Sequence, residues 1–220
     1  MIIERFAAGP WATNCYVVAP AANSEAVIID PGFDSLAEIQ NRLEKHNLHP
    51  VAALLTHGHM DHVWSVVPLC RSHKVPALIH QKDRWMLEDP KLAYPIESWR
   101  QILMMSDNQV DFFPKDIQYV TDKQNLDFGG LNFQALHAPG HTLGSLVFAS
   151  GKTLFSGDTL FNQGIGRTDL PGGDEALMRK TLKQVILPMD DAIKVYPGHG
   201  PSTTIADERQ NNLFLRELTQ

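Results

Sequence analysis

The chain has 220 residues, a formal net charge of -6 and a hydrophobic fraction of 43%, values typical of an ordinary globular protein. This length suits a single domain spanning residues 1–220, while the acidic balance provides no basic surface for nucleic acid. No apolar stretch approaches the ~18 residues of a membrane helix. The first residues lack the pattern of a secretory signal, and Cys15 and Cys70 lie in apolar runs, which predicts free thiols in the reducing cytoplasm.

The first fifty residues alternate short apolar runs with turns, and they predict strands at 1–6, 14–18 and 25–29. Ser35 and Glu38 have the spacing of a capping box, and the apolar positions that follow predict an amphipathic helix ending near residue 46. Asp30 lies where the third strand ends. Its carboxylate could cap local backbone, or it could accept the outer N–H of a metal-bound histidine.

The most informative stretch is Thr-His-Gly-His-Met-Asp-His at 56–62. It follows a short apolar run at 51–55 that predicts a buried strand, and the apolar spacing at 63–70 predicts a helix. A strand-to-helix loop of this kind lies at the sheet edge where α/β folds place their ligands. His57 and His59 point to the same side of an extended segment. Three imidazoles and a carboxylate so close together predict a metal site rather than a solvated loop.

Residues 76–80 form the next expected strand, and His73 and His80 are interpreted as structural or solvated. Residues 81–118 interleave aromatic and charged residues, which predicts a helical excursion near the active site. The excursion could be ordinary packing or a flap over the site. The aromatic and apolar residues concerned are Trp85, Met86, Leu87, Tyr94, Trp99, Ile102, Leu103 and Met104.

The second half of the chain returns to strands, at 131–136, 146–149, 152–155 and 193–196. A glycine-rich loop at 163–173 precedes an expected helix at 174–186, and a closing helix is expected at 205–218. Three residues each follow a predicted strand and adjoin a glycine, namely His141, Asp158 and His199. If these strand ends share one edge with the loop at 57–62, five histidines and two aspartates converge there. Nitrogen and oxygen ligands of this kind suit zinc, iron or manganese.

These motifs resemble the metallo-β-lactamase superfamily. The resemblance rests on the run at 56–62, on Pro-Gly-His-Thr at 139–142, on Ser-Gly-Asp at 156–158 and on Pro-Gly-His-Gly at 197–200, with Asp30-Pro31-Gly32 as the early Asp motif. Within the superfamily the chain most resembles the glyoxalase II, or hydroxyacylglutathione hydrolase, branch in a short form without the full helical C-terminal domain. The implied fold is α+β, a four-layer αββα sandwich with the metals at one edge.

The resemblance also implies a ligand set for two divalent metal ions. One ion would be held by His57, His59 and His141, and the other by Asp61, His62 and His199. Asp158 would bridge them, and Asp30 would support a ligand from behind. Two such ions can lower the pKa of a shared water, and Asp61 could orient the resulting hydroxide. The expected reaction is hydrolysis of a small-molecule thioester such as lactoylglutathione, a step of methylglyoxal detoxification, by a monomer or small homo-oligomer.

Substrate recognition is where the chain departs from the glyoxalase II pattern. Arg167 and Asp169 stand where that branch commonly has a lysine and a tyrosine. Arg167 could bind a substrate carboxylate bidentately, or it could pair with Asp169 or Asp174. The run at 164–169 also resembles persulfide dioxygenases, which would use a single iron on His57, His141 and Asp158. A lactonase or another ester or lactam hydrolase is a further alternative. β-Lactamases commonly have a cysteine at the position of Asp158.

Overall fold

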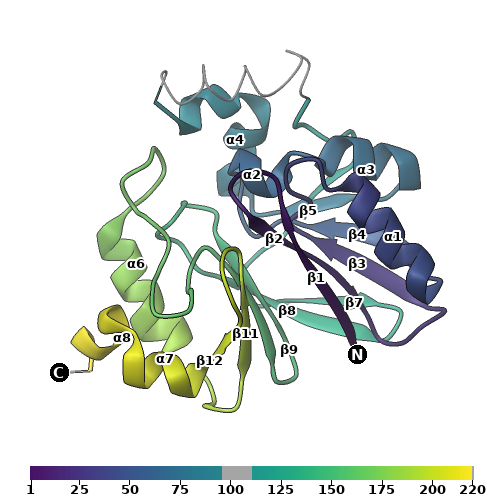
Figure 1. Ribbon diagram of the computed structural model, residues 1–220. Coiled ribbons are helices and arrows are strands. Elements are labelled where there is room, and N and C mark those ends of the chain that lie inside the picture. The colour runs from purple at the N-terminus through teal and green to yellow at the C-terminus, as the bar shows by residue number, and fades with distance from the viewer. Residues whose placement is uncertain (96–110, 220) are drawn as a thin grey trace.

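The structure of the protein is a computed structural model that describes residues 1–95 and 111–219. Two six-stranded sheets pack face to face, and helices cover both outer faces (Figure 1). This arrangement is the expected αββα sandwich. None of the helices in the described ranges is long and apolar enough to cross a membrane.

The strands of the first sheet lie side by side in chain order: β1 (Ile2–Ala8), β2 (Thr13–Ala19), β3 (Glu25–Ile29), β4 (His49–Leu54), β5 (Ala77–Ile79) and β6 (Ile117–Tyr119). The β1–β2–β3 pairs are antiparallel, whereas β3 to β6 pair in parallel. Parallel pairing needs a crossover between strands, and β3 and β4 are joined by α1 (Leu36–His46).

The second sheet also follows chain order, with β7 (Gln124–Phe128), β8 (Leu131–His137), β9 (Leu146–Ser150), β10 (Thr153–Gly157), β11 (Lys194–Pro197) and β12 (Thr203–Thr204). Here β10 and β11 pair in parallel, and the crossover between them contains α6 (Glu175–Thr181) and a π-helical turn at Leu182–Ile186. The remaining α-helices of the described residues are α2 (Met60–Val63), α3 (Val66–His73), α4 (Arg84–Glu88), α7 (Ile205–Asn211) and α8 (Leu213–Glu217).

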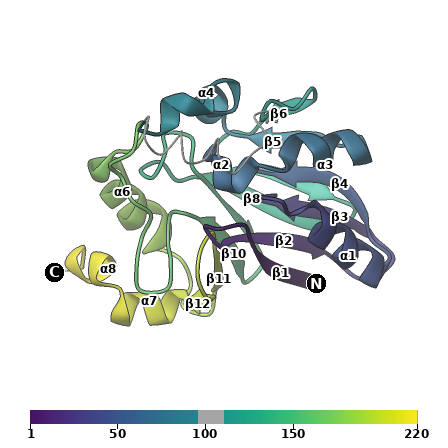
Figure 2. The same cartoon turned by 45° about the horizontal axis from the view of Figure 1, so that its top comes forward.

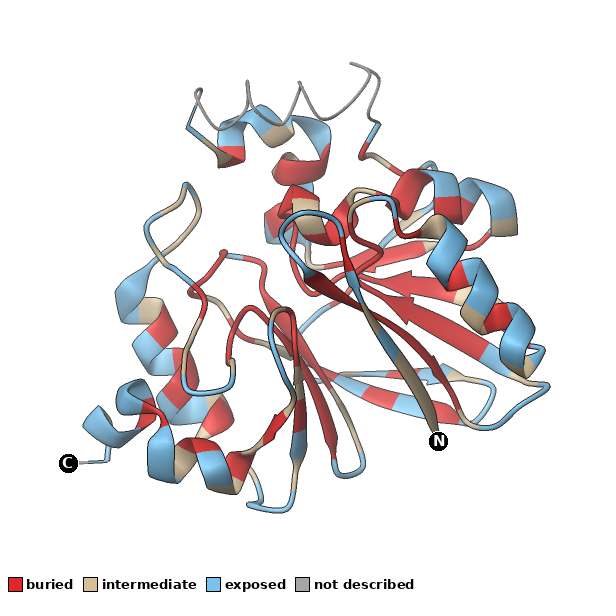
Figure 3. Ribbon diagram, in the orientation of Figure 1, coloured by how far each residue is buried: buried red, intermediate tan, exposed pale blue. Residues whose placement is uncertain are grey.

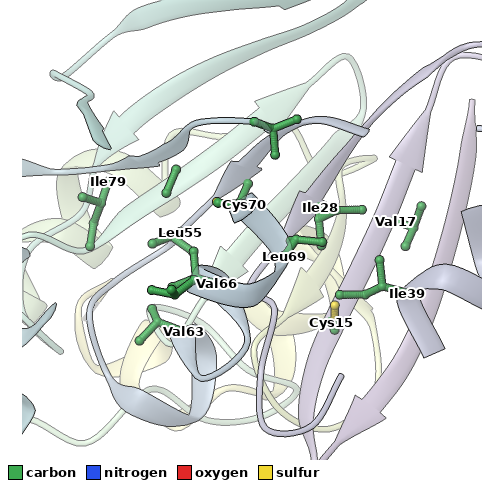
Figure 4. Close-up of a cluster of buried hydrophobic side chains, with 14 of the residues drawn as sticks. Cys15, Val17, Ile28, Ile39, Leu55, Val63, Val66, Leu69, Cys70 and Ile79 are labelled. Carbon is green, nitrogen blue, oxygen red and sulfur yellow. The ribbon is translucent and has the colours of Figure 1, made fainter. Parts of the chain in front are cut away.

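Three apolar layers hold the sandwich together, because side chains alternate between the two faces of each strand. In β2, Cys15 and Val17 point to the helical layer, where they join Ile39 of α1 (Figure 4). Tyr16 and Val18 point the other way, into the layer between the sheets. A third layer joins the second sheet to α6, α7 and α8. The buried strands lie between helices whose outer faces are exposed (Figure 3).

The expected capping box does not form at the start of α1. Ser35 precedes the helix, but its side chain makes no capping hydrogen bond, and its backbone N–H donates instead to Ser65 Oγ at 3.2 Å. Glu38 pairs with Arg42 one turn further along. A tertiary contact has therefore replaced the local cap.

Two expected helices are each broken in two. The helix predicted at 63–70 is interrupted between α2 and α3, because the backbone N–H of Ser65 donates to the Pro31 carbonyl at 2.9 Å instead of continuing the helix. The closing helix breaks at Asn212, whose backbone is extended and whose side chain caps α8. Tertiary partners outside each helix decide both breaks.

Of the described residues in the excursion expected at 81–118, only the first part is helical, since residues 111–116 form no helix and Ile117 already begins β6. The helical part contains 3-10 turns at Gln81–Asp83 and Pro90–Ala93 on either side of α4. When the top of the molecule is turned toward the viewer, α4 lies next to α2 (Figure 2). The expectations for Trp99, Ile102, Leu103 and Met104 fall outside the described residues.

Candidate metal centre

Seven side chains from five segments meet at one end of the two sheets. His57 and His59 lie in the loop after β4, while Asp61 and His62 begin α2. His141 lies between β8 and β9. Asp158 directly follows β10, and His199 lies two residues after the end of β11. These side chains form three overlapping groups, each with its ligand atoms within 4.8 Å of one another. The first group is His57, His59 and His141, the second group is Asp61, His62 and His199, and the third, His57, His62 and Asp158, connects them.

The first group is a cluster of three imidazoles. His141 Nε2 lies 2.8 Å from His59 Nδ1 and 3.2 Å from His57 Nε2. The second group is mixed, with His62 Nε2 and His199 Nε2 3.3 Å apart and each 3.3 Å from Asp61 Oδ2. Asp158 lies between the groups. Its Oδ2 is 3.5 Å from both His141 Nε2 and His199 Nε2.

Four of the five imidazoles are oriented by an acceptor behind the ring. His62 Nδ1 donates to Asp30 Oδ2 at 2.9 Å, so Asp30 lies behind this ring. His141 and His199 donate through Nδ1 to the carbonyls of Arg167 at 2.7 Å and Trp11 at 3.1 Å. His57 Nδ1 faces Thr56 Oγ1, whose own proton goes to Asp30. These partners assign the outer N–H to Nδ1, so each Nε2 faces the centre and offers a lone pair there when that nitrogen carries no proton.

The donor set fits a cation. Inward-facing lone pairs about 3 Å apart repel one another unless a cation or a shared proton lies between them. Two buried atoms of the set, His59 Nε2 and Asp158 Oδ1, have no hydrogen-bond partner in the described part of the chain. Buried polar atoms without a partner are rare in proteins, and for Asp158 a metal ion would satisfy the carboxylate.

Burial and charge divide the cluster into a neutral part and a charged part. Burial lowers the pKa of His57 well below its usual range, lowers that of His59 to about 3, and also lowers that of His141. Burial opposes charge on His62 as well, but Asp61, Asp158 and Asp30 raise its pKa well above the usual range. Metal binding at the second group would therefore displace a proton from His62.

The β1–β2 hairpin holds the second group from outside. Thr13 Oγ1 donates to Asp61 Oδ2 at 2.8 Å. The Trp11 carbonyl orients His199, and the Asn14 side chain donates to the carbonyls of Pro197 and Gly200 on either side of that histidine. Sequence reasoning missed these residues, since nothing in the local pattern of a hairpin indicates what its tip will contact.

Glycine is required next to His199 for space. A Cβ on Gly198 would lie 2.1 Å from Asp158 Oδ1 and 2.7 Å from His62 Cε1. Because Gly198 has no side chain, the backbone next to His199 packs directly against the Asp158 carboxylate. This is the close approach expected from glycine beside the strand ends.

Comparison with known proteins agrees with this geometry. Residues 8–199 match the Metallo-beta-lactamase superfamily. The chain belongs to the metallo-β-lactamase superfamily. Hydroxyacylglutathione hydrolase GloC of Haemophilus influenzae is 35% identical over 218 residues, which cover 98% of each chain. Superfamily members are generally metal-dependent hydrolases that bind divalent ions.

Two solved structures are similar over nearly the whole length. The BLEG-1 B3 metallo-β-lactamase has a TM-score of 0.83 and 37% identity, covering 97% of this chain and 99% of that one. The structure of TTHA1623 in a di-iron-bound form has a TM-score of 0.81 and 34% identity, covering 96% and 100%.

This metallo-β-lactamase superfamily chain has a cavity of about 590 Å³ over the cluster. Three aromatic residues line it together with several of the ligand side chains, namely Trp11, Tyr94 and Phe161. Arg167 also lines it, but its guanidinium makes two 2.7 Å hydrogen bonds to Asp169. Of the alternatives for Arg167, pairing with Asp169 is the one observed.

Proposed function

We propose that the protein is a thioester hydrolase with two divalent metal ions, acting on 2-hydroxyacyl-glutathione such as lactoylglutathione. The observation that carries the proposal is the pair of donor groups separated by Asp158 beneath one cavity. The 35% identity with hydroxyacylglutathione hydrolase GloC over the full length adds support.

The proposed ligand assignment is the one that the superfamily resemblance implies, and two of the three groups of side chains agree with it. His57, His59 and His141 would hold one ion, Asp61, His62 and His199 would hold the other, and Asp158 would be shared between them. Zinc is the proposed metal, with iron or manganese as alternatives. The similar structure of TTHA1623 in a di-iron-bound form supports iron as an alternative. Bound there, two cations polarise a carbonyl and activate water.

The chemistry of the leaving group favours a thioester over an amide. A thiol leaves as thiolate because its pKa is about 8.5, whereas an amide nitrogen must be protonated as it leaves. Asp61 accepts a hydrogen bond from Thr13 on one side and faces the cavity, so it is placed to orient the attacking water. Arg167 is the proposed contact for a substrate carboxylate, which would have to compete with Asp169.

The test is thiol release from lactoylglutathione by purified protein whose metal content has been measured. Rapid release at about two ions per chain is the expected result. A fully metallated sample that releases no thiol would overturn the proposal.

β-Lactam hydrolysis is a second candidate, because the BLEG-1 β-lactamase is 37% identical over nearly the whole chain. Incubation of the same metallated sample with a chromogenic cephalosporin separates the two functions. Oxygen consumption with glutathione persulfide tests the dioxygenase alternative, which the run at 164–169 suggests. The proposed thioesterase should be inactive or weak in both assays.

A further inference from the structure

Asp83 is a buried carboxylate outside the donor set. It ends the 3-10 turn before α4 and has no exposed surface. Its Oδ2 accepts hydrogen bonds from the Gly58 N–H at 3.0 Å and from Thr142 Oγ1 at 2.6 Å. Its Oδ1 accepts from the Gly144 N–H at 2.7 Å. One carboxylate therefore receives three hydrogen bonds from two different loops.

Both of those loops carry histidines of the first group. Gly58 lies between His57 and His59, and Thr142 directly follows His141. The fit is tight, since a Cβ on Gly144 would lie 2.5 Å from the Asp83 carboxyl group and one on Gly58 would lie 3.0 Å from the Asp83 carbonyl oxygen. The carboxylate of Asp83 thus sets the separation between the loops that bring the three imidazoles together.

His59 depends on this support more than the other imidazoles do. Its outer nitrogen, Nε2, is buried without a partner among the described residues, whereas the other four rings are oriented by acceptors behind them. The backbone on both sides of His59 is held instead. Gly58 N–H donates to Asp83, and Met60 N–H donates to the Tyr94 hydroxyl at 3.0 Å.

We propose that Asp83 is a positioning residue for the metal ion held by His57, His59 and His141, and that Tyr94 assists it at His59. The segment from Asp83 to Tyr94 holds the metal loop by its backbone and replaces the missing acceptor behind the His59 ring. This inference rests on the metal assignment in the proposed function, but not on the identity of the substrate.

The test is titration of metal-free Asp83→Asn protein with Co²⁺, followed by visible absorption and by calorimetry. An asparagine keeps one acceptor oxygen but turns an NH₂ group toward a donor, so the loops must separate. We expect about 10–100-fold weaker Co²⁺ binding in one of two sites, the loss typical of a supporting partner. The absorption spectrum of that site should change, and kcat should fall more than KM changes.

Glu208→Gln is the matched control. Glu208 is equally buried and accepts three hydrogen bonds, from Gln163 N–H, Thr203 Oγ1 and Asn212 Nδ2, away from the donor set. The Glu208→Gln protein should lose about as much stability as Asp83→Asn, while its Co²⁺ affinities and absorption spectrum stay unchanged. If Asp83→Asn binds both ions with wild-type affinity and spectrum, or if Glu208→Gln shows the same loss, the proposal is wrong.

Tyr94→Phe provides a second variant in case Asp83→Asn does not fold. It removes only the acceptor of the Met60 N–H, so it should weaken the same Co²⁺ site to a smaller degree, and wild-type affinity and spectrum would contradict the proposal. Failure of the proposed function is distinguishable, because Co²⁺ binding needs no substrate. A wild-type protein that binds two ions but releases no thiol would leave this inference standing.

Discussion

At the scale of single residues, the hydrogen-bond partners on the outer side of the histidine rings determine how the ligands are oriented. Asp30 accepts from His62 Nδ1 and also binds both the N–H and the hydroxyl of Thr56, which in turn faces His57. One buried carboxylate therefore orients two imidazoles that belong to different donor groups. Such outer partners fix the tautomer and direction of a metal-binding histidine.

Asp158→Ala should remove most of the turnover and lower the metal content. Its carboxylate is the group that approaches both sets of imidazoles, within 3.4 Å of His62 and 3.5 Å of His141 and His199. We expect kcat/KM to fall by about 100-fold or more, the size seen when a group that stabilises the transition state is lost. Steady-state thiol release and metal analysis measure both effects, with exposed Asp127→Ala as control. Turnover close to wild type would exclude this role.

Gly198→Ala should disrupt the centre without a change of charge. The added methyl group would clash with Asp158 Oδ1 and with the His62 ring, so the carboxylate must move away from both donor groups. Metal content and turnover should both fall by about tenfold or more, as for loss of other supporting contacts. Gly164→Ala is the control, because its Cβ would make an ordinary 3.9 Å contact with Phe161. Equal behaviour of the two variants would argue against the steric account.

At the scale of elements, a pair of stacked histidines joins the two sheets beside the centre. His80 follows β5 and His137 ends β8, and their rings stack at 4.2 Å with an interplanar angle of 10°. Burial, with the nearby charges of His137 and Lys82, lowers the pKa of His80 to about 4 from its usual 6.5. Of the two roles left open for His80, structural or solvated, the stacking favours the structural one, and protonation of the ring is unfavourable there.

This pKa shift predicts a pH-dependent contribution to stability. The folded protein binds a proton at His80 less readily than the unfolded chain does. The contribution of neutral His80 to the free energy of unfolding is therefore fully present above pH 6.5 and is lost as the pH falls toward 4. His80→Asn keeps an acceptor for the Lys82 N–H but does not titrate.

Urea unfolding of both proteins at pH 7.5 and pH 5 provides the measurement. The stability advantage of wild type over His80→Asn should shrink at the lower pH, by less than about 1 kcal/mol because the ring is partly solvated. Exposed His49→Asn is the control. An advantage of equal size at both pH values would contradict the assignment.

At the scale of the whole molecule, the candidate metal centre connects the two halves of the sandwich. His57, His59, Asp61 and His62 follow a strand of the first sheet, whereas His141, Asp158 and His199 follow strands of the second. Ions held between them would link the sheets at one end, in addition to the apolar layer between the sheets.

Removal of the metal should therefore destabilise the fold. A ligand at about 100 times its Kd stabilises the native state by roughly 2.7 kcal/mol. In a chain of this size each kcal/mol changes the Tm by about 2–4 °C, so we expect the Tm to fall by several degrees. Calorimetric scans before and after dialysis against a chelator measure it. Added Zn²⁺ should restore the Tm, and Asp158→Ala should respond less. An unchanged Tm after complete removal would show that the ions do not link the halves.

Local features of the sequence predicted most strands and the seven residues of the donor set, and the resemblance to the superfamily implied the αββα architecture. Strand ends followed by His or Asp beside glycine are local features, and three imidazoles and a carboxylate within the run at 56–62 strongly indicate a metal site. The broken helices at Ser65 and Asn212 and the absent cap at Ser35 were not predictable, because in each case a backbone or side-chain group binds a partner distant in the sequence.

The supporting groups were decided only by the tertiary structure. Asp83 is 25 positions from Gly58 and 59 from Thr142, and Thr13 is 48 positions from Asp61, so no spacing or periodicity relates them. Local sequence determines which side chains can bind a cation, since that depends on residue type and on the end of a strand. Which groups stand behind those side chains depends on how the two sheets and the β1–β2 hairpin pack, and only the folded chain brings them together.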